Sequence, residues 1–187
     1  MARKRCQRYD DPGHAHELTF SCYRRLPLLS RDRTREWLVE AIEDARGRER
    51  FDLWAYVIMP EHVHVLIHPR EHGYEVSRIL WRIKRPLGRR AVAYLRVNAP
   101  SFLARLTVKR GDGKQETRFW QAGGGYDRNI VEPTTVRNVI DYIHLNPVRR
   151  GLVERPDDWI WSSARWYSGL RPVPLEIDST VPRVFES

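Results

Sequence analysis

The chain has few of the residues that would cross-link it or anchor it to a membrane. Its 187 residues include two cysteines, Cys6 and Cys22. Two thiols are too few for a disulfide framework or a cysteine zinc site, which fits a reducing compartment. No apolar run comes near the roughly 18 residues of a membrane-spanning helix. The basic residues 1–5 are not followed by the apolar segment of a signal peptide. These absences predict a cytoplasmic protein with no membrane attachment.

Acidic residues are absent from one long stretch of the chain. Residues 76–110 contain ten Lys or Arg and no Asp or Glu, in a chain of net charge +9. Residues 36–52, by contrast, mix both signs, as solvated helix faces do. A long stretch of one sign favours phosphate binding over the alternative, which is solubility alone. We therefore expect DNA-binding side chains here and in a second basic group, and the candidates are Lys84, Arg85, Arg89, Arg90, Arg128, Arg149 and Arg150.

Segments with strand-like and helix-like patterns follow one another along the chain and predict an α+β fold with one main domain. Strand-like runs occupy residues 16–23, 51–59, 62–68 and about 127–131, and helical periodicity occupies residues 30–50, 76 onward and 133–146. The basic helix should be interrupted or kinked near Pro86, and residues 98–118 are expected to form loop. The order predicts a split βαβ arrangement, an antiparallel sheet with helices mainly on one face. We divide the chain into a basic N-terminal arm (1–13), the domain (14–167) and a C-terminal tail (168–187).

Two histidines, His62 and His64, occupy alternate positions in the strand predicted at residues 62–68. Its aliphatic side chains are expected on a core face: Val63, Val65 and Ile67. The alternate side chains are expected on a face that is not core: His62, His64, Leu66 and His68. A single strand histidine is usually structural, but two in phase can also hold a divalent metal. His68 lies roughly 13 Å beyond His64 along the strand and is expected outside any such site.

Tyr142 and Asn146 lie one turn apart on the helix predicted at residues 133–146. An apolar stripe defines the buried side of this helix: Val136, Val139, Ile140 and Ile143. Tyr142 and Asn146 lie at the shoulder of that stripe. Tyr142 is either a packing residue with a wet hydroxyl or a nucleophile for a phosphate that a metal polarises. Asn146 precedes Pro147, so it either caps the helix end or provides an oxygen ligand to the metal.

These segments together resemble a known family. Residues 56–66 (YVIMPEHVHVL) and 141–153 (DYIHLNPVRRGLV) resemble the single-tyrosine transposases of the HUH endonuclease superfamily. The likeness is strongest to the branch associated with repetitive extragenic palindromes (REP). Residues 118–121 (RFWQ), residues 158–163 (DWIWSS) and Tyr167 support it in the expected order.

The resemblance implies a ferredoxin-like α+β fold with a catalytic C-terminal helix. It implies a Mg²⁺ or Mn²⁺ cofactor, single-stranded DNA with a hairpin or palindrome as partner, and a 5′-phosphotyrosine intermediate with a free 3′-hydroxyl. By matching positions, Tyr142 is the nucleophile, His62 and His64 are metal ligands and Asn146 is the candidate third ligand. Related transposases have Gln where this chain has the shorter Asn146, so that position departs from the pattern.

Two other functions remain open at the level of the sequence. The chain could be a non-catalytic nucleic-acid-binding protein, in which the histidines are structural and Tyr142 only packs. It could also be a domesticated nuclease, including a metal-dependent hydrolase that activates water and forms no covalent intermediate. The sequence is compatible with a monomer or a homodimer.

Overall fold

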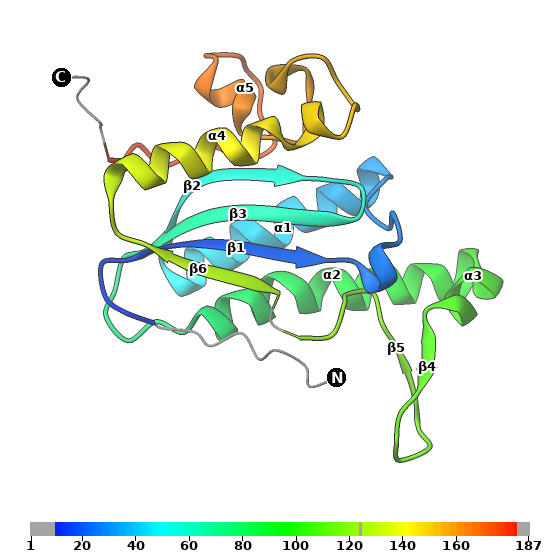
Figure 1. The fold of residues 1–187 in the computed structure, drawn as a ribbon. Helices are drawn as coiled ribbons and strands as arrows, with labels where there is room; N and C mark the ends of the chain where they lie inside the picture. Colours follow the sequence, from blue (N-terminus) through cyan, green and yellow to red (C-terminus); the bar gives the residue numbers. More distant parts are fainter. Residues whose placement is uncertain (1–9, 124, 183–187) are drawn as a thin grey trace.

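A four-stranded antiparallel sheet forms the centre of the protein (Figure 1). The computed structural model describes residues 10–123 and 125–182. The strand order is β2-β3-β1-β6, and the strands are β1 (Ala15–Ser21), β2 (Phe51–Ile58), β3 (His62–Pro69) and β6 (Tyr126–Ile130). Because β3 lies antiparallel between β1 and β2, these two run parallel and are joined through helix α1 (Asp32–Glu49). This is the predicted split βαβ arrangement, and the predicted α+β fold class is confirmed.

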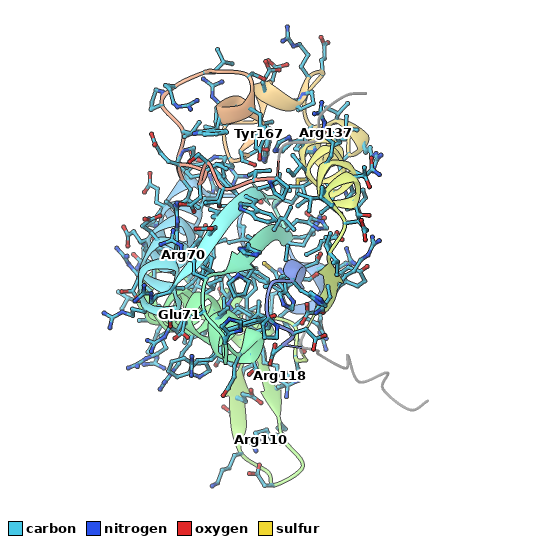
Figure 2. The ribbon with its side chains drawn as sticks, turned by 90° about the vertical axis from the view of Figure 1, so that its left-hand side faces the viewer. Arg70, Glu71, Arg110, Arg118, Arg137 and Tyr167 are labelled. Carbon is cyan, nitrogen blue, oxygen red and sulfur yellow. The ribbon has the colours of Figure 1, made fainter. Side chains whose placement is uncertain are left out.

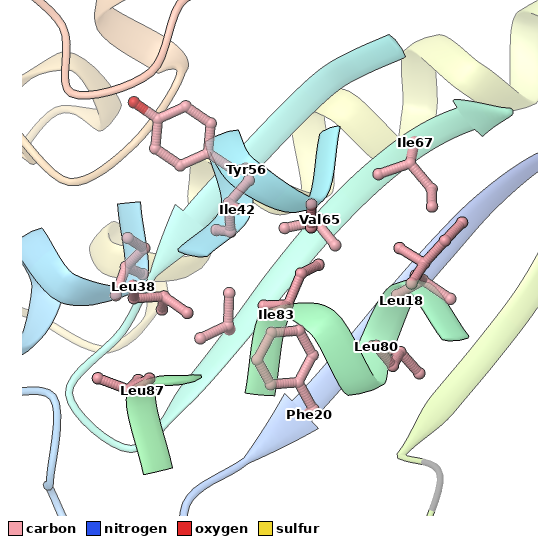
Figure 3. Close-up of a cluster of buried hydrophobic side chains, with 14 of the residues drawn as sticks. Leu18, Phe20, Leu38, Ile42, Tyr56, Val65, Ile67, Leu80, Ile83 and Leu87 are labelled. Carbon is pink, nitrogen blue, oxygen red and sulfur yellow. The ribbon is translucent and has the colours of Figure 1, made fainter. Parts of the chain in front are cut away.

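Two long helices, α1 and α2 (Val76–Asn98), cover one face of the sheet (Figure 1). Side chains that alternate along the strands point into this layer, where they meet the helices (Figure 3). Leu18 and Val65 from the strands and Leu38 and Ile83 from the helices are all fully buried. Each such side chain contributes about 1.5–3 kcal/mol through the apolar surface it removes from water. This larger core fixes the sheet on which the candidate site is built.

The opposite face of the sheet is covered by α4 (Pro133–Arg149) (Figure 1). Leu66 and Val57 are fully buried there in a second core with Ile140 and Ile143 from the helix. The prediction that the His62–Leu66 side of β3 is not a core face was therefore wrong. Strand alternation shows that the two faces differ, but it does not show which of them a distant helix will cover.

The basic helix and the segment after it are more regular than predicted. Helix α2 continues through Pro86, which lies on the solvent side, where water can bond the carbonyl that the proline leaves unpaired. Residues 98–118 contain α3 (Pro100–Arg105) and a hairpin of β4 (Thr107–Lys109) and β5 (Gln115–Thr117). The hairpin projects from the body of the protein, with Arg110 towards its far end (Figure 2).

The loop into β6 makes one very close backbone approach. Gly125 has a φ of +75°, and a Cβ added there would lie 2.1 Å from the carbonyl oxygen of Thr19. Only glycine avoids both the steric cost of positive φ and that collision. The chain therefore enters β6 directly against β1, where Thr19 pairs with Tyr126.

The C-terminal region packs along the outer edge of β2. After the short helices η2 (Pro156–Asp158) and α5 (Ala164–Tyr167), residues up to 182 form no further helix or strand. Leu175 and Ile177 are nevertheless buried in the larger core, and the Asp178 amide N–H donates to the Leu53 carbonyl (3.0 Å). In the described ranges, no helix combines the length and the apolar character needed to cross a membrane. Of the predicted N-terminal arm, residues 1–9 and hence Cys6 lie outside the described residues.

Candidate active site

A cavity of about 760 Å³ lies between the sheet and α4. It is lined by strands β1, β3 and β6 and by α4, with a contribution from the short helix η1 (Tyr23–Arg25) after β1. The four residues predicted for catalysis and metal binding all line this one cavity: His62, His64, Tyr142 and Asn146. Their side chains come from segments about eighty residues apart, so the fold rather than the local sequence brings them together.

The two histidines are buried and each has one ring nitrogen engaged. Their ring centroids lie 4.9 Å apart with the planes nearly perpendicular. His64 Nδ1 is hydrogen-bonded to Thr19 Oγ1 (2.9 Å), its cross-strand neighbour on β1. His62 Nδ1 donates to the Glu61 carboxylate (3.2 Å). Each Nε2 is thereby left as the nitrogen available to a ligand, with the other nitrogen orienting the ring.

Burial also sets the charge of the two imidazoles. Removal from water lowers the pKa of His62 below its ordinary value and lowers the pKa of His64 to about 3. Both rings are therefore neutral at pH 7, with a lone pair that can bind a cation. The exposed fractions of His62 and His64 are 7% and 5%.

Glu61 connects His62 to a basic residue of the cavity. One carboxylate oxygen, Oε1, accepts hydrogen bonds from His62 Nδ1 and from the Arg150 guanidinium (2.7 Å). The sequence indicated only a tight connection at Pro60–Glu61, so this supporting role was missed. A carboxylate beside a histidine of an HxH pair is the signal that could have found it.

Tyr142 combines a packed ring with an accessible hydroxyl. Its exposed fraction is 42%, and its ring lies edge-on to the His64 ring with 5.6 Å between centroids. The Arg149 guanidinium lies 5.2 Å from the centre of the Tyr142 ring. Within residues 10–123 and 125–182 no side chain or backbone group is hydrogen-bonded to the hydroxyl, which leaves it open to a bound substrate.

Asn146 lies inside α4 and not at its end. The helix continues through Pro147 and ends at Arg149, and Gly151, two residues later, has a φ of +65°. The capping alternative for Asn146 was therefore wrong. Its Nδ2 donates to the Tyr142 carbonyl (2.9 Å), which leaves Oδ1 as the atom free to bind a cation.

The donor set fits a loosely held divalent cation. It comprises two neutral imidazole nitrogens and one amide oxygen, which suit Mn²⁺ or Mg²⁺ less strongly than three carboxylates would and also accept zinc or copper. Across the described residues, no three His, Cys, Asp or Glu side chains are grouped as a metal site. Glu17, which the sequence did not single out, also lines the cavity, and burial raises the pKa of its carboxyl.

All the predicted basic residues except Arg90 fall into two groups. Arg128 and Arg150 line the cavity beside the histidines, and Arg149 contacts Tyr142. A second group lines a groove of about 590 Å³ between α2 and the segment before β6: Lys84, Arg85 and Arg89.

Trp81, exposed by 51%, lies in the second groove with Arg85 against its ring (4.6 Å). The groove therefore combines cations with an accessible aromatic face. Arg90 does not line it, because its guanidinium is paired with Glu40 and lies over the Trp37 ring.

Comparisons with known proteins point to one family. No family model matches the chain. A curated protein of Haemophilus influenzae, provisionally named a REP-associated tyrosine transposase, is 27% identical over 143 residues, which cover 73% of this chain and 76% of that protein. A solved structure of a REP-associated tyrosine transposase bound to a REP hairpin matches with a TM-score of 0.66 and 23% identity over all of both chains. The predicted resemblance to the REP-associated tyrosine transposases is thus confirmed, in sequence by the curated relative and in fold by the solved structure.

Proposed function

We propose that the chain is a single-tyrosine transposase and endonuclease that cleaves and rejoins hairpin-containing single-stranded DNA. The observation that carries the proposal is the single cavity in which β3 presents His62 and His64 and α4 presents Tyr142 and Asn146. The relative whose structure is similar is bound to a REP hairpin, which supports a hairpin as the DNA partner. The protein would act as a monomer or a homodimer in the cytoplasm.

Cleavage begins at the Tyr142 hydroxyl. Its oxygen attacks the scissile phosphorus, the new P–O bond to Tyr142 forms, and the bond from phosphorus to the 3′ oxygen breaks. The phenol proton passes to solvent, and the departing 3′ oxygen takes up a proton to become a hydroxyl. A free phenol, with a pKa of about 10, is a weak nucleophile at pH 7. The Arg149 guanidinium, 5.2 Å from the centre of the Tyr142 ring, would stabilise negative charge that develops during the attack.

Three side chains would hold the cofactor beside this reaction. His62, His64 and Asn146 would bind Mg²⁺ or Mn²⁺, and such an ion, when bound, polarises the scissile phosphate as a Lewis acid. Thr19 and Glu61 keep the two imidazoles oriented through their Nδ1 atoms. The Asn146 amide is oriented by its bond to the Tyr142 carbonyl, which connects the proposed third ligand to the backbone of the nucleophile.

The covalent link makes rejoining possible without an external energy source. The phosphotyrosine retains the energy of the broken phosphodiester, and a free 3′-hydroxyl can attack its phosphorus and release the Tyr142 hydroxyl. This favours transposition over simple degradation.

The groove along α2 would hold further DNA. Lys84, Arg85 and Arg89 provide phosphate contacts there, and Trp81 provides an exposed ring on which a base can stack. The two surfaces are close in the sequence, since Trp120 lines the groove and Arg128 lines the cavity.

A trapped adduct tests the proposal. Wild-type protein incubated with Mn²⁺ and a 3′-labelled hairpin oligonucleotide should form a denaturant-stable protein–DNA adduct, and Tyr142→Phe should form none while it retains DNA binding. Tyr126→Phe is a matched control, because Tyr126 is a half-exposed tyrosine of the same cavity, and it should form the adduct. An adduct at wild-type yield in Tyr142→Phe would exclude that nucleophile. Binding without any adduct in the wild type would favour a non-catalytic DNA-binding protein.

A further inference from the structure

The turn after β1 has a strained backbone. Arg24 and Arg25 follow Tyr23 in η1, and both adopt left-handed conformations, with φ of 53° and 52°. Side chains with a Cβ rarely occupy this region, and two such residues in succession are rarer still. Glycine would adopt the same conformation without the steric cost. A strained turn at the rim of a functional cavity points to a role for the side chain that it directs.

Several hydrogen bonds impose this conformation. The Arg25 amide donates to the Cys22 carbonyl (3.0 Å), and the Arg24 amide donates to the Gln121 side-chain oxygen (3.1 Å). The Cys22 amide in turn donates to the Glu61 carbonyl (2.8 Å), next to His62. The turn is therefore connected to the strand that carries the histidines.

The two arginines point to different places. Arg24 lies against the Tyr23 ring, 5.1 Å from its centre. Arg25 lines the cavity with His62 and His64. Its charge acts on both imidazoles, whereas the charge of Arg150 acts on His62. Arg25 is thus the cation that lies near the pair as a whole.

The cavity arginines differ in their partners. Arg150 donates to Glu61, and Arg128 lies opposite Glu17 in the pairing of β1 with β6. In the part of the chain that the structure describes, no carboxylate lies within ion-pair distance of Arg25. A guanidinium without a carboxylate partner can use its paired N–H groups to bind two oxygens of one phosphate.

We infer that Arg25 is a further catalytic residue, which binds the phosphate attacked by Tyr142 and stabilises the charge that builds on its oxygens. The inference rests on the proposed function, because it takes the scissile phosphate to lie in this cavity. The bonds made and broken are those of the tyrosine attack, and Arg25 exchanges no proton in it.

Glycine substitutions separate charge from strain. Arg25→Gly should lower the rate of adduct formation by about 100-fold or more, while its melting temperature stays at or above that of the wild type because the strain is relieved. Arg24→Gly is the matched control, with the same backbone change outside the cavity, and should keep the rate within about twofold. Arg25→Lys should fall between the wild type and Arg25→Gly, since it keeps the charge but loses the paired geometry.

A binding measurement distinguishes failure of this inference from failure of the proposed function. In the Tyr142→Phe background, Arg25→Gly should weaken binding of a labelled REP-type hairpin oligonucleotide with single-stranded flanks and reduce its salt slope by up to about 0.7. If the wild type forms no adduct, this result alone decides on Arg25. Arg25→Gly with wild-type rate and affinity would overturn the inference. So would losses that match those of Arg24→Gly and accompany a lower melting temperature.

Discussion

At the scale of single residues, Asn146 shows how one hydrogen bond decides which atom is available. Its amide nitrogen is committed to the Tyr142 carbonyl, so Oδ1 is the atom that faces other partners. The usual role of Asn near the end of a helix does not apply, because α4 continues for three further residues to Arg149. The oxygen is then either a ligand or an unused acceptor, and these alternatives give different results on substitution.

A metal titration tests Asn146. Asn146→Ala removes the oxygen and should raise the Mn²⁺ concentration needed for cleavage by about 10–100-fold. Asn146→Asp supplies an anionic oxygen at the same distance from the backbone and should retain activity, although it loses the bond to the Tyr142 carbonyl. Asn138→Ala is the control, because Asn138 lies on the same helix and lines the same cavity. Overlapping titration curves for all four proteins would return Asn146 to a structural role.

At the scale of the secondary structure elements, α2 carries most of the cations that the sequence assigned to DNA. The helix distributes them over different surfaces: Lys84, Arg85 and Arg89 line the groove with Trp81, whereas Arg90 is turned towards α1. Helical spacing predicts that residues 85 and 89 share a face, but it does not predict which face a neighbouring acidic residue will cover.

This division makes Arg90 an internal control for DNA binding. Replacing Lys84, Arg85 and Arg89 by Gln should weaken hairpin binding and reduce the salt slope by up to about 0.7 for each lost phosphate contact on single strands. Arg90→Gln should leave the slope unchanged and lower stability slightly through its loss of Glu40. Binding measured from 50 to 200 mM salt decides between these outcomes. An unchanged slope in the triple variant would place the DNA on Arg128, Arg149 and Arg150 alone.

Local sequence patterns predicted the helices and strands better than they predicted which of these elements pack against one another. The period-2 run at residues 62–68 and the stripe around Ile140 and Ile143 both form the expected strand and helix. That α4 lies over His64 depends on a pairing between residues far apart in sequence, which no local period contains. The hairpin of β4 and β5 was missed because its strands have three residues each, too few to show a period.

The residues of the candidate site also differ in how well the sequence predicted them. The residues with distinctive local spacing, such as His62, His64 and Tyr142, could be predicted. Glu61 was missed, although a carboxylate next to an HxH pair is a local signal for its hydrogen bond to His62. Arg25 could not be predicted, because its role depends on a left-handed turn that has no signature in the order of residue types.

At the scale of the whole molecule, buried neutral histidines make stability depend on pH. Burial lowers the pKa of His64 to about 3 and that of His144, which is hydrogen-bonded to Ser163, to about 4. In the unfolded chain these groups take up protons near pH 6.5. The stability that depends on these neutral histidines is therefore fully present above about pH 6.5. It is lost as the pH falls from 6.5 towards their pKa values in the folded protein, because the unfolded state then binds more protons.

Urea denaturation between pH 7.5 and 5.0 tests this dependence. Each buried histidine should account for a loss of about 1–2 kcal/mol at pH 5.0 relative to pH 7.5. His144→Gln should make the dependence shallower, even if it lowers stability at pH 7.5 through the lost bond to Ser163. A wild-type slope in His144→Gln would contradict the assignment.

The close approach of Gly125 to Thr19 limits how this protein can diversify. Any side chain at residue 125 would push β6 away from β1. Thr19 is also the hydrogen-bond partner of His64, so that displacement would reach the imidazole. A loop that looks like a tolerant surface connection therefore contains one position with a single permitted amino acid. Homologues or designed libraries that vary the loop before β6 should keep glycine at this position.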